Sequence, residues 1–407
     1  MPKQPSKTRA GKRKPVIGIA LAGGGPLAAM YEIGALTALA EAVDGLDLNA
    51  ADTYIGISAG GIVAAGLANG ITPQEMCRLF IENDPASSTA FFKPEMLLSP
   101  AFAEFRKRAT AVPGLLGRAA WHYARKTVTR SGSGMLHSFE RLSEALPTGI
   151  FSGKPLERFI AATFAGAGRT NDFRKLAHKL HIIATDLDSG KSVVFGQPGW
   201  DDVPISVAAQ ASSAVPGLFA PVEIKGHHFV DGALRKTLHA SIALEDGVDL
   251  LLCLNPIVPY NAKARHGAGK LAGGGLVDVL SQTIRAVLHS RVEIGMAGYK
   301  LAYPDVDIVL FEPSDDDAEM FFSNIFSYTN RRRMCESAYQ NTRAMLWARR
   351  AELGPMLAKH GMRLKVGMLR DATLTLVDAE PAKQGSTCSD LRSTLDQLEH
   401  YLKVANG

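Results

Sequence analysis

The chain has 407 residues, 46% of them hydrophobic and 21% charged, which is enough material for one large core or two domains. No apolar run approaches the roughly 18–20 residues of a membrane-spanning helix. Four scattered cysteines without paired spacing argue against a disulfide framework and a zinc site. Composition therefore favours a globular protein of a reducing compartment, expected to be cytoplasmic, with neither metal nor cofactor.

Residues 1–15 form a basic stretch without a single acidic side chain. Its charges exceed the net +5 of the whole chain and lie at Lys3, Lys7, Arg9, Lys12, Arg13 and Lys14. With residues 16–22 it imitates a signal peptide, but cleavage near Ala29 would remove a strand and a glycine loop, so a core strand is the better interpretation. We expect a disordered tail that is a candidate for contact with an anionic membrane, and no nucleic-acid partner.

A glycine-rich turn follows the first predicted strand. Residues 16–22 read as a buried parallel strand, Gly23, Gly24 and Gly25 end it, and helical spacing runs over 26–43. Backbone N–H groups before a helix can bind a phosphate or the oxyanion of a tetrahedral intermediate. The turn lacks the Lys-Ser/Thr end of a P-loop, and Ala28 replaces the last glycine of a dinucleotide fingerprint.

Ser58 stands at the centre of a G-x-S-x-G pattern. Residues 56–60 read Gly-Ile-Ser-Ala-Gly, directly after an apolar run predicted as a strand over 52–57 and before a small-residue helix. This is the pattern of a nucleophile elbow, a turn too tight for side chains beside the serine. The alternative is an ordinary turn in which Ser58 only caps the helix.

Asp231 follows another apolar strand, predicted over 228–231. An aspartate before a glycine is usually a turn residue. At the end of a strand in an α/β sheet, however, it lies where such proteins place their chemistry. His227 and His228 nearby suggest a metal or a triad histidine, but an exposed turn explains them better because no further ligand spacing supports a metal.

These three motifs, in this order, resemble those of the patatin-like phospholipase family. Further similarity lies in residues 150–156, 183–190 and 212–221, so that the resemblance covers about 16–260. It implies a three-layer α/β/α fold with a mostly parallel central sheet. It also implies a carboxylic ester hydrolase with Ser58 as nucleophile, Asp231 as its base, and the amides of Gly23, Gly24 and Gly25 as oxyanion hole. The expected substrate is a lipid or other fatty-acyl ester.

One position departs from that family. Leu27 stands where an arginine or lysine is usual, and the segment up to residue 36 is one residue longer than the common pattern. Loss of this charge removes a candidate anchor for an anionic group without removing the backbone donors. The sequence therefore favours neutral esters over phospholipids as substrates.

Three other functions stay open from the sequence. The first is an α/β-hydrolase with a Ser-Asp-His triad that uses His239 or another later histidine, although the elbow comes early for that fold. The second is a lipid-binding scaffold without catalysis, suggested by Leu27. The third is an acyltransferase, because the acyl-enzyme is common to hydrolysis and transfer.

The remaining segments are read as additions to the catalytic domain at 16–260. Residues 86–149, with mixed basic and aromatic side chains, are predicted to form a helical cap that is a second candidate for membrane contact. Residues 261–380 are expected to be a mainly helical extension, with helices at 276–302 and 318–353 and a strand at 306–311. Residues 381–407 read as a linker and terminal helix; no oligomeric state is predicted.

Overall fold

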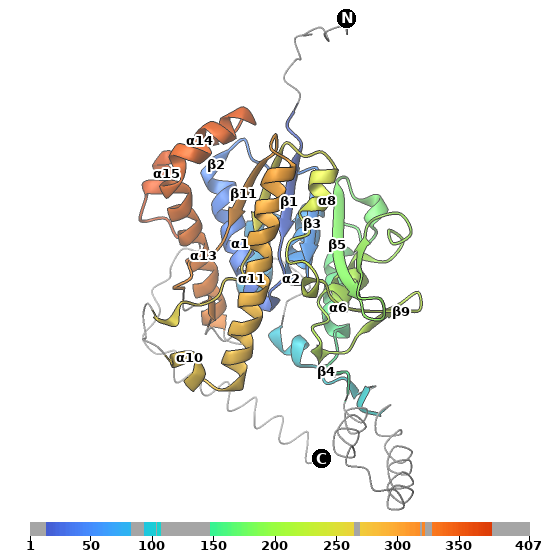
Figure 1. Ribbon diagram of the computed structural model, residues 1–407. Coiled ribbons are helices and arrows are strands. Elements are labelled where there is room, and N and C mark those ends of the chain that lie inside the picture. Colours follow the sequence, from blue (N-terminus) through green and yellow to red (C-terminus); the bar gives the residue numbers. More distant parts are fainter. Residues whose placement is uncertain are drawn as a thin grey trace, which may run out of the picture.

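A central β-sheet with helices on both sides organises the molecule (Figure 1). The computed structural model describes residues 14–82, 93–102, 104–106, 147–263, 269–317, 320–321 and 328–376. Within these residues the sheet has eight strands in the order β11-β10-β1-β3-β5-β9-β8, with β6 also paired to β5. The first five strands of this order run parallel, whereas β6, β8 and β9 are antiparallel to their partners. The prediction of a mostly parallel central sheet is confirmed.

The strands and helices alternate along most of the described chain. The strands are β1 (Ile17–Leu21), β2 (Val43–Asp44), β3 (Thr53–Ile57), β4 (Gly149–Phe151), β5 (Lys179–Asp186), β6 (Ser192–Phe195), β7 (Gly217–Phe219), β8 (Val222–Ile224), β9 (His227–Asp231), β10 (Leu250–Leu254), β11 (Asp307–Phe311) and β12 (Arg363–Leu364). The helices are α1 (Gly25–Ala42), α2 (Ala59–Ala68), α3 (Pro73–Cys77), α6 (Lys154–Phe164), α7 (Ile205–Ser212), α8 (Ser241–Glu245), α10 (Lys270–Gly273), α11 (Leu276–Ala302), α13 (Tyr328–Ala348), α14 (Arg350–Lys359) and α15 (Val366–Arg370).

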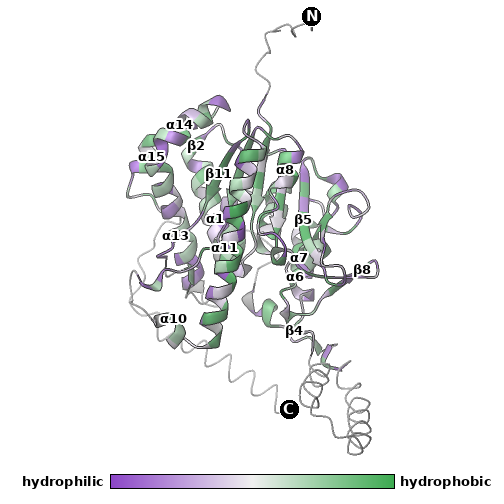
Figure 2. Cartoon of the chain, viewed as in Figure 1, coloured by the Kyte–Doolittle hydropathy of each residue, from purple (hydrophilic) through white to green (hydrophobic). Residues whose placement is uncertain are grey.

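Two separate apolar cores lie on the two faces of the sheet. Ile19 and Leu21 of β1 pack on the side of α1, α2, α7 and α13, whereas Ala20 of the same strand packs on the side of α8 and α11. This alternation follows from the two-residue period of a strand. Because both faces are covered, the central strands are apolar throughout, as Figure 2 shows by their green colour.

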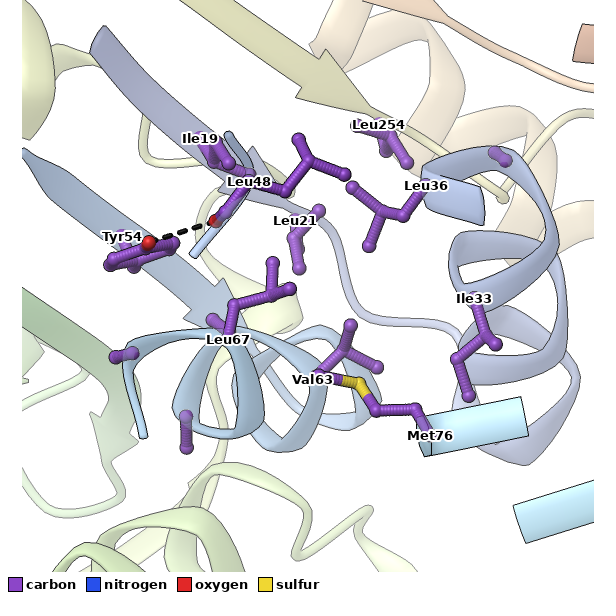
Figure 3. Packing of buried hydrophobic residues seen from close by; sticks show 14 of the residues in the cluster. Ile19, Leu21, Ile33, Leu36, Leu48, Tyr54, Val63, Leu67, Met76 and Leu254 are labelled. Carbon is purple, nitrogen blue, oxygen red and sulfur yellow. Dashed lines mark hydrogen bonds between the residues drawn. The ribbon is translucent and has the colours of Figure 1, made fainter. Parts of the chain in front are cut away.

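The larger core lies between β1, β3, α1 and α2 (Figure 3). Leu21, Ile33 and Val63 are fully buried there or nearly so. Tyr54 also lies in this core, and its hydroxyl donates a hydrogen bond of 2.8 Å to the carbonyl of Leu48. The polar tip of a buried tyrosine thus has its partner, and the loop before β3 is fixed to the strand.

Helix α1 is buried on nearly all sides because α13 covers its outer face. Gly34 allows this contact: a Cβ atom there would lie 2.2 Å from the carbonyl oxygen of Cys335 on α13. Strand β11 also joins the sheet, beside β10. The segment predicted as a helical extension therefore contributes a strand to the central sheet and a helix against α1.

Several predicted segments lie wholly or mostly outside the described residues. They are the tail at 1–15, of which only 14 and 15 are described, most of the cap at 86–149, and the terminal segment at 381–407. The domain boundaries proposed from the sequence remain predictions.

Candidate active site

The serine elbow is a turn of one residue between β3 and α2. Ser58 has φ 54° and ψ −125°, a backbone conformation that residues with a side chain rarely adopt. A Cβ atom on Gly56 would lie 2.4 Å from the carbonyl oxygen of Gly60, and one on Gly60 would lie 2.5 Å from that of Ala22. The two glycines are therefore required by close backbone approach, and the strained turn projects the serine from the end of the strand.

A second serine fixes this turn from α7. The Ser212 hydroxyl accepts a hydrogen bond of 2.7 Å from the Ser58 amide and donates one of 2.5 Å to the carbonyl of Ile183 on β5. Ser212 is fully buried. The family resemblance includes Ser212 in the segment 212–221, but the sequence assigns it no role. Since the Ser58 amide already has a partner, it is not available to a substrate oxygen.

Asp231 lies at the end of β9, close enough to the Ser58 side chain for that hydroxyl to lower the pKa of its carboxyl. Its carboxylate oxygen Oδ1 also accepts a hydrogen bond of 2.8 Å from the amide of Ala233, and Asp231 is only 5% exposed. Burial raises the pKa of this carboxyl to about 6, against the lowering effects of the bonds from Ala233 and Ser58. The group can therefore both accept and release a proton near neutral pH.

The glycine loop between β1 and α1 approaches the same serine. A Cβ atom on Gly23 would lie 3.0 Å from the Cβ of Ser58 and 3.3 Å from that of Ala233. Gly24 and Gly25 have φ values of 145° and 70°, which a residue with a side chain rarely adopts. Among the described residues, the amides of Gly23, Gly24 and Gly25 have no hydrogen-bond acceptor. They form a group of unpaired donors at the start of a helix that has no acidic residue in its first turn.

An apolar cavity of about 140 Å³ adjoins Ser58. It collects side chains from α1, α2, α6, α7 and the loops beside them. The residues that line it are Gly25, Pro26, Ala29, Met30, Ser58, Ala59, Ile62, Val63, Phe80, Leu97, Gly153, Leu156, Gln210, Ser213, Ala214, Val215, Leu218, Phe219, Ala220 and Val222. Gln210 and Ser213 add polar groups to a wall that is otherwise apolar apart from Ser58. Such a lining suits a hydrocarbon chain.

The structure places the candidate histidines away from Ser58. His239 is buried with its Nε2 atom 3.5 Å from the Ser192 hydroxyl. His227 lies in β9, half exposed, with Nδ1 2.8 Å from an oxygen of Asp186, and His228 is similarly exposed. Across the described part of the chain, no histidine ring hydrogen-bonds to Ser58 or Asp231.

The described residues show neither a cluster of metal-binding side chains nor a membrane-spanning helix. No group of three or more His, Cys, Asp or Glu side chains is arranged to hold a metal ion in the ranges that the structure describes. No helix in those same ranges is long and apolar enough to cross a bilayer.

Comparison with known proteins identifies the family. The model of the patatin-like phospholipase family matches residues 19–244, more than half of the chain. The chain belongs to this family. Membership supports a lipid acyl hydrolase in general terms. It also confirms the resemblance that the three sequence motifs indicated.

The solved structures that this chain matches include VipD and ExoU. VipD from Legionella pneumophila is 15% identical, with a TM-score of 0.37 over 84% of this chain and 69% of VipD. The type III effector protein ExoU is 18% identical, with a TM-score of 0.35 over 83% of this chain. The matched region spans about half of ExoU, 54% of its length.

Leu27, the departure from the family pattern, is part of the core. It is half-buried and packs against the larger apolar cluster from the first turn of α1. The side chain therefore adds apolar contacts where a cation would have supplied charge.

Proposed function

We propose that this protein is a serine acyl-hydrolase that cleaves fatty-acyl ester bonds of lipids through a Ser58–Asp231 dyad. The observation that carries the proposal is the contact of the strained Ser58 side chain with a buried carboxylate at the edge of an apolar cavity. Family membership supports the same chemistry.

Acylation begins with attack of the Ser58 hydroxyl oxygen on the ester carbonyl carbon. The serine proton passes to Asp231, whose raised pKa makes its carboxylate a stronger base than an exposed aspartate. The carbonyl oxygen becomes an oxyanion and accepts hydrogen bonds from the free amides of the glycine loop. Such donors are worth about 3–4 kcal/mol each in related chemistry.

Collapse of this intermediate breaks the bond to the alcohol. The leaving alkoxide takes the proton from Asp231, and the acyl group remains on Ser58 as an ester. Water then loses a proton to Asp231 and attacks the acyl carbonyl. The fatty acid departs when the Ser58 oxygen regains the proton, so that the enzyme ends as it began.

The cavity and Leu27 indicate the kind of ester. The acyl chain lies along the apolar wall formed by residues such as Met30, Ile62 and Leu156. In the first turn of α1, beside the glycine loop, Leu27 offers no charge to a phosphate. We therefore propose neutral fatty-acyl esters as better substrates than anionic phospholipids.

The test is hydrolysis of p-nitrophenyl esters of increasing chain length. We expect Ser58→Ala and Asp231→Asn each to lower kcat by about a thousandfold or more. The exposed Ser314→Ala serves as a matched control and retains full activity. Retained hydrolysis in His239→Ala supports the dyad. Loss of hydrolysis in a His239→Ala variant that still folds supports a triad. A native protein that hydrolyses no ester contradicts the proposal.

A further inference from the structure

A second cavity, on the opposite face of the sheet, lies between α11 and the loop that follows Asp231. Its volume is about 310 Å³, within the range of small-ligand sites. Met296 and Tyr299 of α11 form one wall, and the segment 235–239 forms the other. Figure 1 shows α11 crossing this face of the molecule beside α8.

Three cations surround this cavity, and none of the described residues that line it is acidic. Arg235 and Lys236 come from the loop and Arg291 from α11. Throughout the described residues, none of the three forms an ion pair with a carboxylate. Most charged side chains at a surface can turn to an acidic neighbour, so three unpaired cations around one hollow leave a local excess of positive charge.

Hydrogen bonds to the backbone hold the two guanidinium groups in place. Arg235 donates through Nη1 to the carbonyl of Gly190 at 2.6 Å, and Arg291 donates through Nη1 to that of Leu234 at 2.7 Å. Each bond uses one of the five N–H donors of an arginine. The remaining donors are available to a ligand, and their positions are already restricted before it binds.

The floor of the cavity also favours an anion. His239 is buried there with a left-handed backbone, φ 45°. Burial, with Lys236 and Arg235 nearby, lowers its pKa to about 3, so the ring stays neutral. No carboxylate of the described residues acts on this ring to offset the two cations.

We propose that this cavity binds a phosphate group, held by Arg235, Lys236 and Arg291. A phosphate offers several strong acceptor oxygens and suits two guanidinium groups and an ammonium better than a single carboxylate does. The phosphate belongs either to a lipid headgroup or to a soluble phosphate ester. Exposed Ile294, which lines the cavity, offers apolar contact to a lipid.

The site is connected to the candidate catalytic loop. Leu234, whose carbonyl binds Arg291, lies three residues after Asp231, and Ala233 between them binds the Asp231 carboxylate through its amide. The segment 231–235 therefore contributes to both the cavity and the surroundings of Asp231. The binding proposal itself goes beyond the proposed hydrolase function and is tested without measuring catalysis.

The test compares two variants of equal charge change in the full-length protein. Arg235→Gln/Lys236→Gln removes two cations of the cavity, and Lys175→Gln/Lys365→Gln removes two exposed lysines elsewhere. Binding of inorganic phosphate is measured by isothermal titration calorimetry, with acetate as a carboxylate control. Sedimentation is measured with vesicles of phosphatidylcholine, alone or with phosphatidic acid or oleic acid.

We expect saturable phosphate binding, or sedimentation that requires phosphatidic acid, in the native protein and the control variant. The cavity variant loses at least about tenfold in affinity, as expected for charge-assisted bonds. Binding of phosphate alone assigns a soluble ligand, and binding of phosphatidic acid vesicles alone assigns a lipid. Equal binding by both variants, equal response to the carboxylate probes, or no binding in either arm overturns the proposal. Circular dichroism confirms that the variants fold.

Discussion

At the scale of single residues, the environment of Asp231 supports the proposed Ser58–Asp231 dyad as a site that works near neutral pH without a histidine. An exposed aspartate is too weak a base, but burial raises the pKa of Asp231 to about 6. The Ser58 hydroxyl and the Ala233 amide both stabilise its charged form, so burial is the larger effect. The carboxyl is thereby matched to proton transfer with serine and with a leaving alkoxide.

The pH dependence of ester hydrolysis follows from this pKa. Asp231 must be ionised to accept the serine proton, so kcat/KM should rise about tenfold per pH unit below about 6 and become constant above about 7. Measurement with a substrate whose leaving group does not titrate in this range gives the profile. If kcat/KM is already constant from well below pH 5 upward, Asp231 is not the base.

Ionised Asp231 should also destabilise the fold. Its pKa is raised in the folded state, so the folded protein holds this proton more tightly than the unfolded chain does. The stabilisation from this proton is complete below the unfolded pKa near 4 and is lost as pH rises through about 6. Asp231→Asn should therefore stabilise the protein at pH 8 by about 3 kcal/mol, and by less toward pH 4. Urea unfolding at both ends of this range measures the difference; an equal effect at each pH would contradict it.

At the scale of elements, the contact between α1 and α13 depends on the missing side chain of Gly34. Its Cβ position lies 2.2 Å from a backbone oxygen of α13, which cannot move by a side-chain rotation. Gly34→Ala should therefore cost at least about 2 kcal/mol of unfolding free energy.

Gly298 provides the matched control for that substitution. It lies exposed inside α11 with nothing within 4 Å of its Cβ position. Gly298→Ala should stabilise the protein by about 0.5–1 kcal/mol, because alanine is the better helix former. Denaturant unfolding of both variants tests the pair, and the same sign of effect in both would refute the packing argument.

Much of the central sheet could be predicted from the sequence because its strands are continuous apolar runs. The expected strand at 306–311 is β11, and the expected helix at 276–302 is α11 with the same bounds. The short strands β2, β4, β7 and β12 were not predicted. Two or three residues give no periodicity, and their pairing is decided by distant partners.

The candidate site likewise has parts that could be predicted from the sequence and parts that could not. Ser58, Gly23 and Asp231 lie in local patterns that the sequence displays, and the structure brings them side by side. The contact of Ser212 with the Ser58 amide joins residues 154 positions apart. No local pattern marks such a contact. The cations of the second cavity likewise meet only because α11 packs beside the loop after Asp231.

At the scale of the whole molecule, distant segments combine to form the apolar cavity beside Ser58. Its wall includes residues of α1, α2, α6 and α7. Ile62 and Phe80 also line a smaller apolar cavity of about 20 Å³ behind it. These two side chains therefore separate the substrate cavity from additional apolar space.

Changes at Ile62 should shift the preferred acyl length in opposite directions. Ile62→Ala joins the two cavities and should favour longer chains, whereas Ile62→Phe fills the first and should favour shorter ones. We expect the ratio of kcat/KM for long and short p-nitrophenyl esters to change by about tenfold each way. The ratio is measured within each variant, so it is independent of the amount of folded protein. An unchanged ratio in both would show that the acyl chain lies elsewhere.

The proposed function requires first that Ser58 becomes acylated, with Asp231 as base and the glycine amides as donors to the oxyanion. The most direct measurement is reaction with a fluorophosphonate, followed by mass analysis of the labelled peptide. We expect a single adduct on Ser58 in the native protein, none in Ser58→Ala, and labelling slowed by about a hundredfold or more in Asp231→Asn. An adduct on another residue, or no adduct in folded native protein, would contradict it.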